Sequence, residues 1–559
     1  MQSAGKPPSR GIPFLLLLLT RGRTIANLRL VRHSPRRMTK QCYITTAIDY
    51  VNGQPHLGHA YEKVITDVIA RSQRLLGRDV FFLTGLDEHG QKVQQAALSE
   101  GKQPQTYCDE LAQSWRAFTT KLGLTNDDFI RTTELRHKQV VQALLTRLHR
   151  EGHFYKAQYE GFYSSREETF LTDKDRNSDG TFDPSWGEVI RLQEENYYFK
   201  LKQHQPWLID YLENNPDFVR PSYRRNEVLG FLKNNALEDL CITRPASRLN
   251  WGIPIPFDPN YVTYVWFDAL VNYITVPAVR GDTLVRKALE LESQVPDSSA
   301  PLWPADLHVI GKDILKFHSV YWPIMLKVAG LPLPKQLLVH GFWQKNNAKI
   351  SKSTGNIVDP VAVIDDWGLD AFRFYVLREL DIGPDGNWTD AGFAARYQAE
   401  LANGLGNLVN RSLSMLARYR DAIVPPPSTD LRGVAVEVIA KVESDLRAQE
   451  LQSALIQIWN LITRANQYVD QTAPFKLAKD PSQAQRLDEV LYNLCEVCRV
   501  LAVLLSPFLP ETSLRIYGQL NLGPLPQSFS DAQWGGLKAG HRIGHPAPLF
   551  PRRDEKLKK

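Results

Sequence analysis

The sequence predicts an α/β domain with a parallel sheet, interrupted by an inserted segment and followed by a helix bundle. Residues 41–83 run through an apolar stretch, a Gly-containing turn, a helical stretch and a second apolar stretch, which is how a parallel sheet begins. Residues 152–221 change to aromatic, charged and turn residues. From residue 394 to 520 nearly every stretch has the spacing of an amphipathic helix.

The first 40 residues differ in composition from the rest of the chain. They are rich in arginine, and the first acidic residue is Asp49. This profile is typical of a mitochondrial presequence. The apolar run at 13–19 raises the alternative of a secretory signal, but it is too short to span a bilayer. We expect mitochondrial import, because a secreted protein would rarely keep five cysteines without a pairing pattern.

Composition leaves the partner open. The 559 residues are enough for three or four domains, and a net charge of +6 permits a polyanionic partner without requiring one. Cys495 and Cys498 form an isolated CxxC in an apolar helical stretch. We interpret the pair as helix packing. A metal or redox site is the alternative, and it is weakened because a structural zinc needs four ligands.

The first half of the sheet is predicted from the turns and loops that separate its apolar stretches. A strand at 41–46 leads through a turn into a helix over 56–76, and a second strand at 78–83 ends in the loop TGLDEHG. Further helices are expected at 104–124 and 134–151. Ligands of such sheets lie at the carboxyl ends of the strands, where His56, His59 and Asp87 fall.

The second half resumes with apolar stretches that read as strands, at 261–273, 306–314 and 335–342. The string KISKS follows the last of these in a loop rich in Gly, Asn and Lys. The helical region after it is broken by the proline-rich link at 424–430.

Two short motifs suggest a polyphosphate site. HLGH places His56 and His59 at a helix start, where unpaired backbone N–H groups favour phosphate, and Gly58 permits close approach. KISKS supplies Lys349 and Lys352 from a loop. Either motif alone could be structural or a solvated charge pair. Together, in this order, they resemble the signature of class I aminoacyl-tRNA synthetases.

Longer strings narrow the resemblance to the methionyl-tRNA synthetase family, in a mitochondrial or bacterial-like form. They are TAIDYVNGQPHLGHAYE, TGLDEHG, YVWFDALVNY, IGKDILKFHSVYWP, KISKSTGN, LGNLVNR and ANQYVDQTAPF. The resemblance implies an α/β Rossmann-like catalytic domain with a connective insertion, followed by an all-α anticodon-binding helix bundle. The implied boundaries are a presequence at 1–40, catalytic halves at 41–150 and 251–345, the insertion at 151–250, a KISKS and stem-contact region at 346–395, the bundle at 396–520 and a tail at 521–559.

The resemblance also implies roles for individual residues. His56, His59, Lys349 and Lys352 would be catalytic. ATP would be held by Gly58, Gly311, Asp313, Lys349 and Lys352. Asp87 would bind the α-amino group of methionine, and the rest of the pocket would be Ala47, Ile48, Tyr50, Trp266, Ala269, Tyr273, Ile314 and His318. Aromatic rings suit a thioether side chain.

The implied chemistry is activation of methionine by ATP, with Mg²⁺ accompanying the nucleotide, and transfer to tRNA(Met). In the bundle, Asn407 and Arg411 lie one turn apart and Phe475 follows, so they would read and stack anticodon bases. Relatives commonly have tryptophan where this chain has Phe475 and proline where it has Leu270. The insertion holds no cysteine in its knuckle-like segment, so we expect no zinc, and it is too short for an editing domain.

Three alternatives remain open at this point. One is a synthetase for another apolar amino acid, another a catalytically silent RNA-binding relative, and the third a small nucleotidyltransferase. The amino acid that supports ATP–pyrophosphate exchange separates them. We expect a monomer in the mitochondrial matrix with no membrane association.

Overall fold

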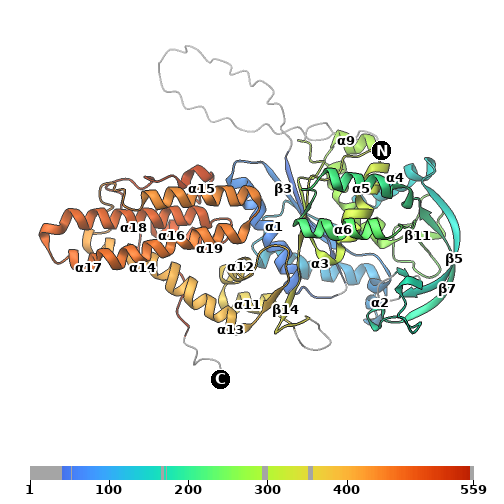
Figure 1. Ribbon diagram of the computed structural model, residues 1–559, viewed down its shortest axis with the longest axis horizontal. Helices are drawn as coiled ribbons and strands as arrows, with labels where there is room; N and C mark the ends of the chain where they lie inside the picture. The colour runs from blue at the N-terminus through green and yellow to red at the C-terminus, as the bar shows by residue number, and fades with distance from the viewer. Residues whose placement is uncertain are drawn as a thin grey trace, which may run out of the picture. The chain divides into compact units, whose positions relative to one another are not determined.

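The computed structural model describes residues 41–51, 53–164, 169–171, 173–291, 300–349 and 357–553 (Figure 1). The predicted presequence and Lys352 therefore lie outside the described residues. Within this described part, seven strands form one sheet in the order β2-β3-β1-β12-β13-β8, with β4 also pairing with β3, and all its pairings are parallel. The strands are β1 Cys42–Thr46, β2 Asp49–Tyr50, β3 Val80–Asp87, β4 Asp128–Arg131, β8 Val219–Arg220, β12 Leu307–Gly311 and β13 Leu337–His340.

Both faces of this sheet are covered, as expected for parallel strands. Side chains alternate between two cores: Ile44 and Val309 face one, while Tyr43 and Ile310 face the other. The first core includes helix α1 (Leu57–Leu75) and α3 (Pro104–Lys121). The helices of the second core are α4 Leu135–Arg150, α5 Gln205–Asn214, α6 Ser222–Asn234, α8 Asn272–Val279 and α10 Trp322–Val328.

The insertion forms its own antiparallel sheet in the order β6-β5-β7-β9. β5 and β7 pair along their full length, from Phe154↔Phe199 to Ser164↔Val189, and are seen as the long curved arms in Figure 1. β8 lies within the sequence range predicted for the insertion, yet it joins the main sheet beside β13. The strands are β5 Phe154–Ser164, β6 Thr169–Leu171, β7 Val189–Phe199 and β9 Leu240–Cys241.

One predicted strand is wrong over most of its length. Residues 261–273 form only the short strand β11 (Tyr261–Thr263), which pairs with β10 (Thr243–Pro245) outside the main sheet. The rest is helix, α7 (Val265–Leu270) followed by the start of α8. The segment is buried almost throughout. A continuous apolar run of this kind does not distinguish a buried strand from a buried helix.

After β13 the chain forms a small sheet and then helices. β14 (Trp343–Lys345) pairs with β15 (Ala348–Lys349) and β16 (Gly386–Trp388). The long helices of the bundle run side by side in Figure 1 and contact one another. The helices of this half are α11 Pro360–Trp367, α12 Leu369–Arg378, α13 Asp390–Arg396, a π-helix Tyr397–Gly406, α14 Asn407–Arg420, α15 Arg432–Ala448, α16 Leu451–Thr472, α17 Pro474–Leu477, α18 Ala484–Leu505 and α19 Pro510–Gln519.

The fold matches the α/β domain, insertion and helix bundle predicted from the sequence. Cys495 and Cys498 are buried in α18 as free thiols, in agreement with a packing role. Within the described residues no helix is both long and apolar enough to cross a membrane. In the same ranges, no three His, Cys, Asp or Glu side chains gather where a metal could bind. The absence of zinc stays a prediction.

Candidate active site

The carboxyl ends of four adjacent parallel strands meet at one edge of the main sheet. β1 is followed by Ala47, β3 ends at Asp87, β12 at Gly311 and β13 at His340. The chain passes from β1 to β3 on one side and returns as β12 on the other, and open α/β sheets bind their ligands at such a switch. The fold therefore brings predicted site residues from both sequence halves to one edge.

His56 and His59 cap the first turn of α1. His56 is the N-cap, and its Nδ1 accepts the backbone N–H of Gly58 at 3.1 Å. Nδ1 of His59 accepts the backbone N–H of His56 at 3.2 Å. The two rings stack with centroids 3.7 Å apart. This reciprocal arrangement is a capping box built from histidines, and it orients both rings at the helix N-terminus.

These caps decide which ring nitrogen of His56 and His59 carries the proton. Because Nδ1 of each ring accepts a backbone N–H, the neutral ring must be protonated at Nε2. An Nε2–H group donates to phosphate oxygens, and the partial positive charge of a helix N-terminus favours the same anions.

Gly58 leaves space for the ring of His56. A Cβ on Gly58 would lie 3.0 Å from Cε1 and 3.2 Å from Nδ1 of His56. The crowding would push the imidazole away from the N–H that it caps.

Gly311 and Asp313 stand at the end of β12. A Cβ on Gly311 would lie 2.6 Å from Oδ1 of Asp313, so only glycine lets this carboxylate fold back over the strand end. Desolvation raises the pKa of Asp313 above its usual value, while the nearby His340 opposes the rise. The resulting pairing of a carboxylate with an open backbone suits recognition of ribose hydroxyls.

His340 links this strand end to α1. Its Nε2 lies 3.1 Å from Oε2 of Glu62, and its Nδ1 lies 2.8 Å from the carbonyl oxygen of Gly341. Burial lowers the pKa of His340, but Glu62 and the carbonyl more than offset this and raise it overall. Both partners are acceptors, so the imidazolium form, which donates from both nitrogens, fits the site.

Tyr273, His318 and Ile314 form a buried hydrogen-bonded chain. Nδ1 of His318 lies 2.9 Å from the carbonyl oxygen of Ile314, and Nε2 lies 2.7 Å from Oη of Tyr273. Burial lowers the pKa of His318 to about 4, so the ring is neutral at neutral pH. Because a carbonyl only accepts, Nδ1 carries the proton and Nε2 accepts from the Tyr273 hydroxyl.

The other predicted pocket residues lie around this chain. Tyr50 on β2 is the register partner of Asp87 on β3, which places the two at the same edge. Trp266 stacks on Phe317, next to His318, with ring centroids 3.7 Å apart. The side chains of Ala47, Ile48 and Ile314 belong to one apolar cluster with Tyr273. Ala269 is buried in α7.

Of the two predicted lysines, the structure describes the backbone position of Lys349 only. Lys349 lies on strand β15 and not in a loop, because Asn346 and Asn347 both take positive φ angles and form a tight two-residue turn between β14 and β15. Lys352 lies outside the described residues, as does the rest of KISKS beyond Lys349.

The three predicted anticodon residues lie on two helices of the bundle. Asn407 opens α14, and Arg411 follows one turn later. Arg411 is half-buried and lies 3.3 Å from Asp470, near the end of α16. Phe475, on the short α17 that follows, is 45% exposed. An exposed aromatic ring is suited to stacking on single-stranded bases.

Several polar residues near the carboxyl ends of the main-sheet strands were not predicted from the sequence. They are Glu62 and His340, described above, and a cluster of His89, Asp268 and His137. The strings TGLDEHG and YVWFDALVNY contained His89 and Asp268, but nothing in the sequence showed that they meet. His137 gave no signal, since a histidine in an amphipathic helix is ordinary.

Comparison with known proteins adds to this geometry. The model of the family described as tRNA synthetases class I (M) matches residues 42–180 and 186–413, and the anticodon binding domain of methionyl tRNA ligase matches 428–558. Methionine–tRNA ligase of Caldanaerobacter subterraneus is 41% identical over 92% of this chain and 80% of its own length. That of Rhizobium meliloti is 42% identical over 92% and 99%.

A solved structure of similar form is that of Mycobacterium tuberculosis methionyl-tRNA synthetase in complex with methionyl-adenylate. It superposes with a TM-score of 0.83 at 38% identity, covering 92% of this chain and 100% of that one. The free state of the same enzyme gives a TM-score of 0.78 at 36% identity.

A parallel sheet with a histidine-capped helix at its switch point, joined to a helical anticodon-binding domain, defines a class I aminoacyl-tRNA synthetase. Within that class, the family models and the relatives named above have methionine specificity. The chain belongs to the methionyl-tRNA synthetase family, and its activity is that of a methionine–tRNA ligase.

Proposed function

We propose that this enzyme activates methionine with ATP to methionyl-adenylate and transfers the methionyl group to tRNA(Met) in mitochondrial translation. The observation that carries the proposal is the convergence at one sheet edge of a histidine-capped helix, the Gly311–Asp313 strand end and the Tyr273–His318 chain. ATP enters with Mg²⁺ as substrate, and the enzyme acts as a monomer.

In the activation step, a carboxylate oxygen of methionine attacks the α-phosphorus of ATP and pyrophosphate leaves. Negative charge grows on the phosphate oxygens, so donors placed in advance lower the barrier. His56 and His59 supply two Nε2–H donors, and Lys349 and Lys352 supply cations from the KISKS segment. Gly311 and Asp313 hold the ribose. No covalent enzyme intermediate is needed.

The methionine side chain lies against Trp266, Ala269 and Tyr273, with Asp87 paired to the α-amino group. The neutral His318 is consistent with this assignment, because a fixed tautomer keeps the Tyr273 hydroxyl engaged and leaves the pocket wall uncharged. An uncharged, aromatic wall favours a thioether, since sulfur–aromatic contacts contribute about 0.3–1.5 kcal/mol.

The amino-acid assignment is tested by ATP–pyrophosphate exchange with methionine, leucine, isoleucine and valine. Methionine is expected to support exchange at least about a hundredfold better than the others, as kcat/KM, because no editing domain corrects errors. Exchange driven better by leucine or valine would refute the pocket assignment. Exchange with none of them, combined with tight tRNA binding, would indicate a silent relative.

Mitochondrial localisation is proposed from residues 1–40 alone. Their arginine-rich, acid-free composition supports import into the matrix. Residues 1–40 fused to a fluorescent protein should deliver it to mitochondria, whereas the same segment with its arginines replaced by glutamine should leave it in the cytosol. Delivery to the secretory pathway would favour the signal-peptide alternative.

A further inference from the structure

Asp268 joins three segments that are far apart in the sequence. Its Oδ2 lies 2.6 Å from Nδ1 of His89, in the loop after β3, and its Oδ1 lies 2.6 Å from Nε2 of His137, in α4. Asp268 itself belongs to α7. At most 2% of any of these three side chains is exposed. Three polar side chains with no access to water are costly unless their charges and hydrogen bonds are matched.

The hydrogen bonds of the cluster have fixed directions at Asp268. A carboxylate only accepts, so Nδ1 of His89 and Nε2 of His137 each donate to it. Nδ1 of His137 lies 3.0 Å from Oγ1 of Thr275, and the same hydroxyl oxygen lies 3.0 Å from the carbonyl oxygen of Val271. Thr275 thereby holds the far side of the His137 ring.

The pKa of Asp268 agrees with this pairing. Burial alone would raise it, but the charges and hydrogen bonds of His89 and His137 lower it to about 2. The cluster is thus a directional ionic contact: each carboxylate oxygen points at one ring. Apolar side chains of the same volume could fill the space but could not set these angles.

The cluster lies beside the residues assigned to methionine. His89 is two positions after Asp87, and Asp268 stands between Trp266 and Ala269 in α7. The His89–Asp268 bond therefore links the loop directly after Asp87, the proposed amino-group ligand, to the helix that carries the pocket wall.

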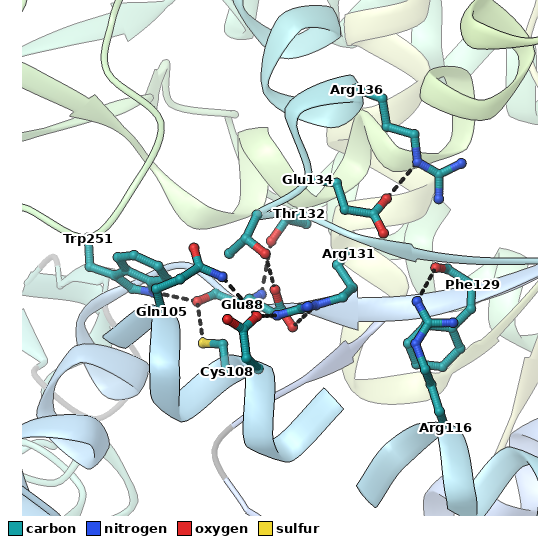
Figure 2. A network of polar contacts seen from close by, with 12 residues as sticks. Glu88, Gln105, Cys108, Arg116, Phe129, Arg131, Thr132, Glu134, Arg136 and Trp251 are labelled. Carbon is teal, nitrogen blue, oxygen red and sulfur yellow. Dashed lines mark hydrogen bonds and ion pairs between the residues drawn. The ribbon is translucent and has the colours of Figure 1, made fainter. Parts of the chain in front are cut away.

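Glu88 fixes the other side of the same loop, as Figure 2 shows. Its backbone N–H donates to Oγ1 of Thr132 at 2.9 Å, and its carboxylate accepts from Nε of Arg131 at 2.7 Å. The indole N–H of Trp251 donates to the backbone carbonyl oxygen of Glu88. Glu88 thus anchors the loop to the β4 side, while His89 ties it to α7. Both anchors hold the two residues that directly follow Asp87.

We propose that the His89–Asp268–His137 cluster is a positioning device for methionine, which holds Asp87 and the Trp266-bearing helix at the separation that the amino acid requires. The three residues act through Asp87 and Trp266 and do not touch the substrate, and the assignment rests on the roles proposed above for those two residues. Loss of the device should weaken methionine binding and leave ATP binding unchanged, because the ATP residues lie on α1, at the end of β12 and in the KISKS segment.

The test compares Asp268→Asn with Asp282→Asn in the full-length enzyme. Asp282 is another buried carboxylate, which accepts backbone N–H groups from Leu284, Leu302 and Trp303, and it has no assigned role in the site. In ATP–pyrophosphate exchange we expect Asp268→Asn to raise KM for methionine at least about tenfold with KM for ATP within about twofold. Asp282→Asn should lower the thermal midpoint while leaving both KM values within about twofold.

Rescue by amides of different length gives a second readout. Glutamine places its N–H near the position of Nε2 of histidine, whereas asparagine places it near Nδ1. His137→Gln should therefore keep a lower KM for methionine than His137→Asn, although both lose the imidazole ring. If His137 only filled space, His137→Gln and His137→Asn would have equal KM values for methionine, and that result would contradict the proposal.

Two outcomes of the Asp268→Asn measurement would also overturn the proposal. One is a KM for methionine in Asp268→Asn that stays within twofold of the unsubstituted enzyme. The other is a parallel rise of both KM values, which would mean that the site as a whole had collapsed. Failure of the unsubstituted enzyme to exchange with methionine would instead defeat the proposed function, so the two failures are distinguishable.

Discussion

The protonation states of individual histidines bear on the chemistry of the candidate active site. His56, His59 and His318 each have a tautomer set by a backbone or hydroxyl partner. His340 faces acceptors at both nitrogens, and His137 donates from Nε2 to Asp268. The five rings therefore serve as donors, acceptors or cations according to their surroundings, which residue type alone does not reveal.

The first prediction concerns the pH dependence of stability at His318. Burial lowers its pKa to about 4 in the folded state, against about 6.5 when unfolded. As the pH falls, the unfolded chain thus binds a proton at His318 before the folded chain does. The contribution of His318 to the free energy of unfolding is therefore fully present above about pH 6.5 and is lost as the pH falls towards 4. The stability advantage of the wild type over His318→Gln should shrink by about 3 kcal/mol between about pH 7 and 4, measured by urea unfolding. A difference that does not change with pH would contradict the neutral ring.

The second prediction concerns Lys352. If it stabilises the charge that grows on the phosphates, Lys352→Ala should lower the rate of adenylate formation by at least about a hundredfold. The Kd for methionine should stay within about threefold, as judged by rapid-quench kinetics. Lys335→Ala is the control, because Lys335 pairs with Asp306 at the opposite, amino end of the strands and should change neither value. A large loss of methionine affinity at unchanged rate would reject the phosphate role.

At the scale of elements, a buried ion pair ties α1 to the helices that follow the sheet. Asp67 on α1 lies 2.8 Å from Nη2 of Arg373 on α12, and neither side chain is exposed. The same guanidinium donates to the carbonyl oxygens of Pro507 and Phe508, between α18 and α19. The helix that presents His56 and His59 is thereby joined to the end of the bundle.

The third prediction follows from this pair. Arg373→Ala removes the guanidinium from Asp67, which keeps Arg71 as a charged partner, and leaves the carbonyl oxygens of Pro507 and Phe508 without their donor. Breaking this buried contact should lower the free energy of unfolding by about 3–5 kcal/mol. The exposed pair of Arg447 and Glu443 on α15 is the matched control, and Arg447→Ala should cost about 1 kcal/mol or less. Denaturant unfolding measures both. Equal losses in the two variants would show that burial does not govern the Asp67–Arg373 contact.

At the scale of the whole molecule, the residues proposed for activation and those proposed for RNA recognition lie in separate parts of the chain. The former lie mainly at the edge of the parallel sheet, and Arg411 and Phe475 lie in the bundle. Substitutions in the bundle should therefore affect the two half-reactions unequally.

The fourth prediction tests this separation. Arg411→Ala should lower kcat/KM for aminoacylation about tenfold or more, since one base contact contributes about 1–3 kcal/mol, while ATP–pyrophosphate exchange stays within about twofold. Arg418→Ala, an exposed arginine on the same helix, is the control and should change neither. Equal loss of exchange and aminoacylation in Arg411→Ala would mean that the bundle is structural for the active site.

The sequence by itself determined the class of fold and the positions of the motifs. Apolar runs separated by helical spacing predicted the parallel sheet, and helical periodicity predicted the bundle, because these patterns reflect local geometry. The strings around His56 and Asp87 pointed to the strand ends for the same reason. Where nearly every side chain is buried, as at 264–273, the apolar pattern has no period that separates a helix from a strand, and the predicted strand is in fact helical.

Only the tertiary structure decided which side chains meet. Asp268 lies 131 residues from His137 and 179 from His89 along the chain, and Glu62 lies 278 from His340. Hydrogen bonds of this kind depend on how strands and helices pack, and no local pattern encodes them. The same holds for charge: whether a histidine is neutral or an imidazolium follows from the acceptors and donors that folding places against it, and those partners come from distant parts of the chain.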